Sequence, residues 1–115
     1  MPRAFDEREL LERVDNDWEF LDETVQMLSA DGPALVGEIR QAADRGDAPA
    51  VGRTAHALKG MVSNFCAPAT QASALEVERI GKAGDLSSVS ALLTDLESQL
   101  NALIADLTEF LATRQ

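Results

Sequence analysis

Residues 86–110, LSSVSALLTDLESQLNALIADLTEF, carry the clearest regular pattern of apolar residues in the chain and decide its fold. The apolar positions follow one another at intervals of three or four residues: Leu86, Val89, Leu93, Leu96, Leu100, Leu103, Leu107 and Phe110. This interval places all of them on one side of an α-helix of about 25 residues. The stretch therefore predicts a long amphipathic helix whose apolar side belongs to the core.

Two further helices are predicted just before this one. The segment from Ala48 predicts a helix of about five turns that ends at Ala67–Pro68. Its apolar positions are Val51, Ala55, Leu58, Val62 and Phe65. The next helix is expected to begin at Pro68 and to end at Gly81 and Gly84–Asp85, carrying Ala69, Ala72, Leu75 and Ile80.

The N-terminal part predicts shorter helices. A short amphipathic segment after Asp6 contains Leu10, Leu11 and Val14, and Asp15-Asn16-Asp17 offers N-caps for the next helix. That helix has apolar residues at Trp18, Leu21, Val25 and Leu28. Because Asp31-Gly32-Pro33 interrupts the series, we expect a break there and a new helix with Leu35, Ile39 and Ala43, stopped at Arg45-Gly46-Asp47.

The fold class expected from these segments is all-α, as an antiparallel four-helix bundle with one or two short extra N-terminal helices. A length of 115 residues, with 45% apolar and 4% aromatic residues, is typical of one helical domain over residues 1–115. A coiled-coil dimer built on the last helix is the weaker alternative.

Composition excludes several classes of function. The chain has 10 Lys+Arg against 20 Asp+Glu, a net charge of -10, which opposes binding to nucleic acid or to an anionic membrane surface. Cys66 is the single cysteine, and neither a signal peptide nor a membrane span is evident, so a cytoplasmic protein is expected. One His and one Cys cannot build a zinc site, and nucleotide-binding glycine motifs are missing, so no cofactor is expected.

His56 is the only histidine, and a helical wheel at about 100° per residue turns it away from the apolar side of its helix. The residues within about 60° of it are Pro49, Gly52, Arg53, Lys59, Gly60 and Ser63. Gly52 and Gly60 are unfavourable inside a helix, so we interpret them as spacers that leave room for an approaching group. Residues 48–75 contain no Asp or Glu, which indicates a locally positive face suited to a phosphoryl group.

The stretch Ala55-His56-Ala57-Leu58-Lys59-Gly60, followed by Ser63-Asn64-Phe65 and Ala67, resembles the signature of histidine-containing phosphotransfer (HPt) domains. Gly46-Asp47, Leu75-Glu76 and Gly84-Asp85 extend the resemblance over most of the chain. The resemblance implies that His56 is the phosphoacceptor, that Lys59 balances the phosphoryl charge and that Gly60 clears space. Many members have Gly where this chain has Cys66.

The function implied by the resemblance is that of a phosphorelay intermediate without ATP-dependent kinase activity of its own. His56 Nε2 would accept a phosphoryl group from the aspartyl phosphate of one response-regulator receiver domain and pass it to the aspartate of another. The receivers, including those of hybrid sensor kinases, would supply an acidic pocket and Mg²⁺. Arg53 and Lys59 would help such an acidic partner to dock.

Three other functions are weighed against this one. A histidine-kinase dimerisation domain needs an acid directly after the histidine and a proline five residues on, where this chain has Ala57 and Met61. The phosphotransfer domain of a chemotaxis-type kinase is closer and stays an alternative; it would need an ATP-binding domain elsewhere in the polypeptide, and these residues contain none. A helical adaptor that binds partners without being phosphorylated is the second alternative.

Overall fold

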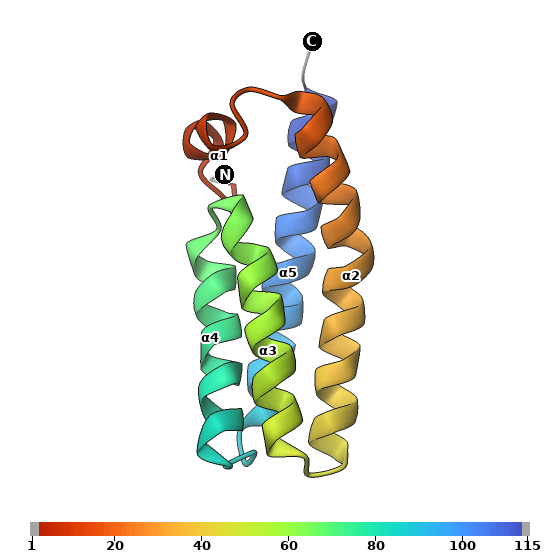
Figure 1. Cartoon of the computed structure of the whole chain (residues 1–115), viewed down its shortest axis with the longest axis vertical. Coiled ribbons are helices and arrows are strands. Elements are labelled where there is room, and N and C mark those ends of the chain that lie inside the picture. Colours follow the sequence, from red (N-terminus) through yellow and green to blue (C-terminus); the bar gives the residue numbers. More distant parts are fainter. Residues whose placement is uncertain (1–2, 114–115) are drawn as a thin grey trace.

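The computed structural model describes residues 3–113, which form five α-helices and one short 3₁₀ helix and contain no strand (Figure 1). The helices are α1 (Glu7–Arg13), α2 (Trp18–Asp44), α3 (Ala48–Val62), η1 (Ser63–Phe65), α4 (Pro68–Ala83) and α5 (Val89–Ala112). The predicted all-α class is therefore confirmed. Residues 1, 2, 114 and 115 of the expected 1–115 domain lie outside the described residues.

The four long helices form a bundle in which neighbours run in opposite directions, and α1 lies at one end of it (Figure 1). Helix α2 packs against α3 and α5, and α4 packs against the same two helices. The predicted stripe of α5 is its buried side from Leu93 to Phe110, and Leu86 precedes the helix as a partly buried residue. Leucines fill much of the core because their unbranched Cβ suits a helix and their bulk fills the space between helices.

Helix boundaries follow the capping signals. The side chains of Asp6, Asp17 and Asp47 accept hydrogen bonds from the backbone N–H groups three residues later, at the starts of α1, α2 and α3. These bonds satisfy donors that have no partner inside the helix. Gly46 ends the loop before Asp47 with a φ of 69°, a conformation that glycine adopts without steric cost.

The predicted break at Asp31-Gly32-Pro33 is wrong, because α2 continues through Pro33. The buried positions keep their interval across the proline: Leu21, Val25, Leu28, Gly32, Val36, Ile39 and Ala42. An interior proline costs about 3 kcal/mol, and burial of one continuous stripe against α3 and α5 offsets that cost. Gly32 also lacks the Cβ that Pro33 would crowd, and it packs against Leu100.

The predicted apolar face of α4 is also wrong, although the helix itself is confirmed. Ala69 and Ala72 are exposed, and Leu75 and Ile80 are only partly buried. The buried residues are Thr70, Ala74, Val77, Glu78 and Gly81. The face of α4 that is buried is the one with small side chains, because α4 approaches α3 very closely. A Cβ on Gly81 would lie 2.7 Å from Gly52 Cα.

The end of α3 differs from the prediction of a helix reaching Ala67–Pro68. The α-helix ends at Val62, the 3₁₀ turn of η1 follows, and Cys66 adopts the left-handed conformation with φ 55° and ψ 47°. This conformation reverses the chain into α4. Within residues 3–113, no helix combines the length and apolarity needed to cross a bilayer.

Candidate functional site

His56 lies on the outer side of α3 with 66% of its side chain exposed, which confirms the orientation predicted from the helical wheel. Its Nδ1 lies 2.8 Å from Glu78 Oε2 on α4. An ionised carboxylate can only accept a hydrogen bond, so Nδ1 is the nitrogen that donates. In the neutral ring, Nε2 then keeps its lone pair and is the nucleophilic nitrogen.

Glu78 is the centre of an ion-pair cluster and is only 3% exposed. Lys59 Nζ lies 2.7 Å from its Oε1, and Lys82 Nζ lies 2.8 Å from its Oε2. Lys59 first, then Lys82 and His56, hold the pKa of Glu78 at about 2, below its ordinary 4.5, and outweigh the opposing effect of burial. The carboxylate is therefore charged at neutral pH and fixes the edge of the imidazole that faces α4.

The expectation of an acid-free face around His56 is wrong, because Glu78 contacts the imidazole. Residues 48–75 indeed lack acids, but Glu78 comes from the next helix and reaches beneath the imidazole. A signal for it was present in the sequence, because Glu78 stands four residues before Lys82 and shares a helix side with Ala74, Val77 and Gly81. A single acid in a row of buried residues requires cationic partners nearby.

Gly52 does not act as a spacer for access in the way the sequence indicated. It is buried, and a Cβ on it would lie 3.4 Å from the backbone nitrogen of Lys82 on α4. Its missing side chain serves the contact of two helix backbones, which brings Glu78 and Lys82 to His56. Gly60, in contrast, is exposed, and a Cβ on it would meet nothing within 4 Å.

The remaining predicted site residues, Arg53 and Ser63, have different surroundings. Arg53 is exposed and forms no ion pair within residues 3–113. It lines a shallow depression of about 420 Å³ together with Pro49, Gly52, His56 and Lys82. Ser63 Oγ donates to the Gly60 carbonyl at 2.6 Å, so its hydroxyl belongs to the end of α3.

Cys66 is buried next to the start of α4, and burial raises the pKa of its thiol. Its carbonyl accepts a hydrogen bond from Asp6 N, which ties the N-terminal segment to this turn. The positive φ of Cys66 gives a physical reason for glycine at this position in similar sequences, because glycine adopts that conformation without strain.

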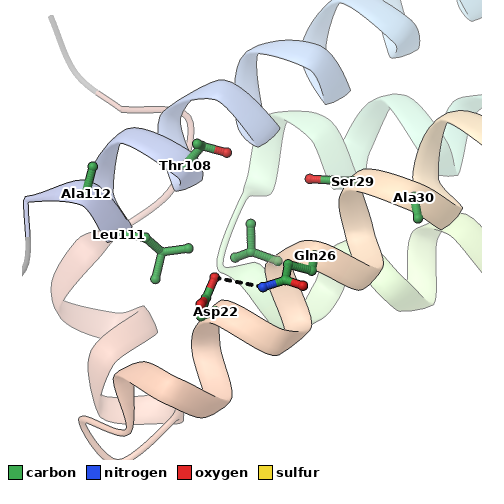
Figure 2. A pocket seen from close by; sticks show the side chains of 8 residues that line it. Asp22, Gln26, Ser29, Ala30, Thr108, Leu111 and Ala112 are labelled. Atoms are coloured by element: carbon green, nitrogen blue, oxygen red, sulfur yellow. Dashed lines mark hydrogen bonds between the residues drawn. The ribbon is translucent and has the colours of Figure 1, made fainter.

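A wider depression between α2 and α5 offers no comparable chemistry (Figure 2). Its lining includes Ser29, Thr108 and Leu111, and its one charged residue is Asp22, which accepts a hydrogen bond from Gln26 at 3.3 Å. Among the described residues, no group of three or more His, Cys, Asp or Glu could hold a metal ion. The cluster around His56 is therefore the candidate site.

Comparisons with known proteins identify the family and the fold of the chain. Residues 23–108 match the family model described as the Hpt domain. The crystal structure of histidine-containing phosphotransfer protein B from Pseudomonas aeruginosa PAO1 has the same fold, with a TM-score of 0.90 and 21% identity over 100% of both chains. No curated protein sequence matches the chain significantly.

Proposed function

This chain belongs to the Hpt domain family and is a histidine phosphotransfer intermediate of a two-component phosphorelay, and we propose that His56 is the residue that carries the phosphoryl group. Hpt domains are phosphotransfer modules rather than kinases, and they interact with receiver domains. One observation carries the assignment to His56. Its Nδ1 contacts Glu78 while 66% of its side chain is exposed, so Nε2 is available to the pocket of a partner.

The chemistry follows from this geometry. The Nε2 lone pair attacks the phosphorus of an aspartyl phosphate, the N–P bond forms, and the P–O bond breaks so that its electron pair returns to the aspartate carboxylate. The Nδ1 proton stays in its hydrogen bond to Glu78, so the transfer needs no separate base. The second transfer, to the aspartate of another receiver, is the reverse of the same step.

The roles of the other residues are part of the proposal. Lys59 adds positive charge to the site, and Gly60 leaves space for the receiver. Arg53 attracts the acidic pocket of the receiver and so helps it to dock. The Mg²⁺ of the reaction belongs to the receiver, and this chain contributes no ATP-dependent step. A rigid helix that presents an exposed nucleophile suits phosphoryl transfer, in which positioning and charge stabilisation dominate. A cytoplasmic location, shared with cytoplasmic receivers, stays a prediction.

Phosphorylation of His56 is tested with a receiver domain carrying a labelled aspartyl phosphate. We expect the wild-type chain to acquire an acid-labile, alkali-stable label and His56→Gln to acquire none, with unchanged circular dichroism. Label on His56→Gln would refute the site. An unlabelled wild-type chain that still binds the receiver would instead indicate a helical adaptor that acts without phosphorylation.

A further inference from the structure

The ammonium of Lys59 is bound to Glu78, so it is not available to contact a phosphoryl group on Nε2. Its side chain is only 25% exposed, and its ammonium forms an ion pair with Glu78 Oε1, a buried oxygen with no hydrogen-bond partner within the described residues. Moving Lys59 away would leave a buried, charged oxygen without a cation, which is strongly unfavourable. The positive charge of Lys59 is therefore directed at the carboxylate.

The two ring nitrogens of His56 also face different surroundings. Glu78 lies at the Nδ1 edge of the imidazole, and Nε2 lies at the opposite edge. A phosphoryl group bonded to Nε2 consequently projects away from the buried carboxylate and into the more open space around the ring. The cations that contact it must be those that border this open space.

The shallow depression beside His56 supplies such cations. Its five lining residues include Arg53 and Lys82 and no acid. Arg53 is exposed, unpaired within residues 3–113 and one helical turn before His56 on the same side. Lys82 is 68% exposed on a flexible stem, and Glu78 keeps Lys59 and His56 as partners if Lys82 turns to another anion.

We propose that Arg53 and Lys82 form the binding subsite for the phosphoryl oxygens of phosphorylated His56, while Lys59 acts as a positioning residue that holds Glu78. This inference rests on the proposed function of His56. The planar guanidinium of Arg53 can donate two parallel hydrogen bonds to phosphoryl oxygens, and the ammonium of Lys82 adds a second charge. Two cations match the double negative charge of a phosphoryl group near neutral pH.

The test needs no receiver. Phosphoramidate transfers its phosphoryl group to an imidazole nitrogen with loss of ammonia, and ³¹P NMR then follows the second ionisation of the bound group as pH is varied. A nearby cation favours the dianion, so we expect Arg53→Gln to raise the midpoint by roughly half a pH unit and Lys82→Gln to raise it by a similar amount. Arg53→Lys should restore part of the shift, and Arg8→Gln on α1 should leave the midpoint unchanged.

The possible results separate the two proposals. If His56→Gln shows the same ³¹P signal as wild type, the phosphoacceptor is wrong and the proposed function fails. If His56 is phosphorylated but Arg53→Gln and Lys82→Gln keep the wild-type midpoint, the subsite is wrong. A rise in Lys59→Gln alone would make Lys59 the phosphoryl ligand. If Lys59→Gln unfolds, the Arg53 and Lys82 variants decide the question, because both side chains are exposed.

Discussion

The orientation of the His56 ring depends on one buried carboxylate. Glu78 accepts from His56 Nδ1 and is surrounded by Lys59 and Lys82. Replacing it with Gln keeps an oxygen that can accept from Nδ1 but removes the charge that the lysines balance. Replacing it with Ala removes both. The two variants therefore separate the positioning of the ring from the charge beneath it.

The first prediction concerns the pH dependence of stability. Because the pKa of Glu78 is about 2 in the folded chain and ordinarily 4.5, its stabilising effect is complete above 4.5 and is lost as the pH falls towards 2. We expect the stability difference between wild type and Glu78→Gln to shrink over this range. Thermal unfolding of both proteins from pH 7 to pH 2 measures it. A constant difference would show that Glu78 is not the titrating group.

Gly60 carries the second prediction. A side chain at this position meets nothing within 4 Å, so Gly60→Ala should stabilise the fold by up to about 1 kcal/mol. Gly60→Gln should keep the melting temperature and strongly slow transfer from a receiver, because the longer side chain stands one turn from His56. Labelling by phosphoramidate should be unaffected. Equal slowing with the small donor would place the defect in the chemistry instead of in docking.

The directions in which side chains point from a single helix could be predicted from the sequence, but the contacts between helices could not. The wheel of α3 correctly gave the outward direction of His56 and the open side of Gly60, since both depend only on the helical period. Glu78 and Lys82 were missed because they reach His56 across the contact of α3 with α4. That contact depends on how closely the two backbones approach.

At the level of helices, the same dependence on contacts between helices explains two of the three errors in the fold, the break at Pro33 and the buried face of α4. Capping residues and apolar intervals correctly predicted that α1, α3, α4 and α5 exist. Local signals failed at Pro33, where burial of a continuous stripe outweighs the cost of a proline. They also failed on α4, where apolar residues occur on several sides and the glycine contact selects one of them.

The third prediction tests that glycine contact. Gly81→Ala places a Cβ 2.7 Å from Gly52 Cα and 3.0 Å from the Ala48 carbonyl oxygen, so α4 must move away from α3. We expect a loss of about 1–3 kcal/mol in the free energy of unfolding and slower phosphotransfer, because Glu78 moves away from His56. Chemical denaturation and receiver-dependent labelling measure the two effects.

Gly37 on α2 provides the matched control for this substitution. A Cβ there meets nothing within 4 Å, so Gly37→Ala should stabilise the helix by about 0.5–1 kcal/mol and leave transfer unchanged. If Gly81→Ala behaved like Gly37→Ala, close backbone packing would not be what positions Glu78.

The molecule has two parts: the bundle of α2 to α5, which carries the His56 cluster, and a cap at one end, formed by Phe5 and α1. Helix α1 lies outside residues 23–108, the part that matches the Hpt model. The cap is held by Arg13, which donates to the Ser63 carbonyl at 2.7 Å, and by the edge-to-face contact of Phe5 with Phe110, whose ring centres are 5.4 Å apart.

The fourth prediction separates these two parts. Phe5 is 6% exposed, so Phe5→Ala should lower the free energy of unfolding by about 3 kcal/mol. The rate of phosphotransfer, measured well below the melting temperature, should stay at the wild-type value because the His56 cluster does not include the cap. A slower transfer in the folded variant would give α1 a part in binding the receiver.

The buried carboxylate beneath His56 has a further consequence for signalling. In the proposed phosphorylation of His56, a ring with phosphorus on Nε2 and a proton on Nδ1 carries a positive charge, so an anion beside Nδ1 favours it over the neutral form of the free ring and lowers the phosphoryl-transfer potential of the intermediate. The balance between forward and reverse flow along the relay is then set partly by a residue hidden from both receivers. A substitution at Glu78 would therefore change the balance of phosphoryl flow without altering any surface by which the partners recognise the protein.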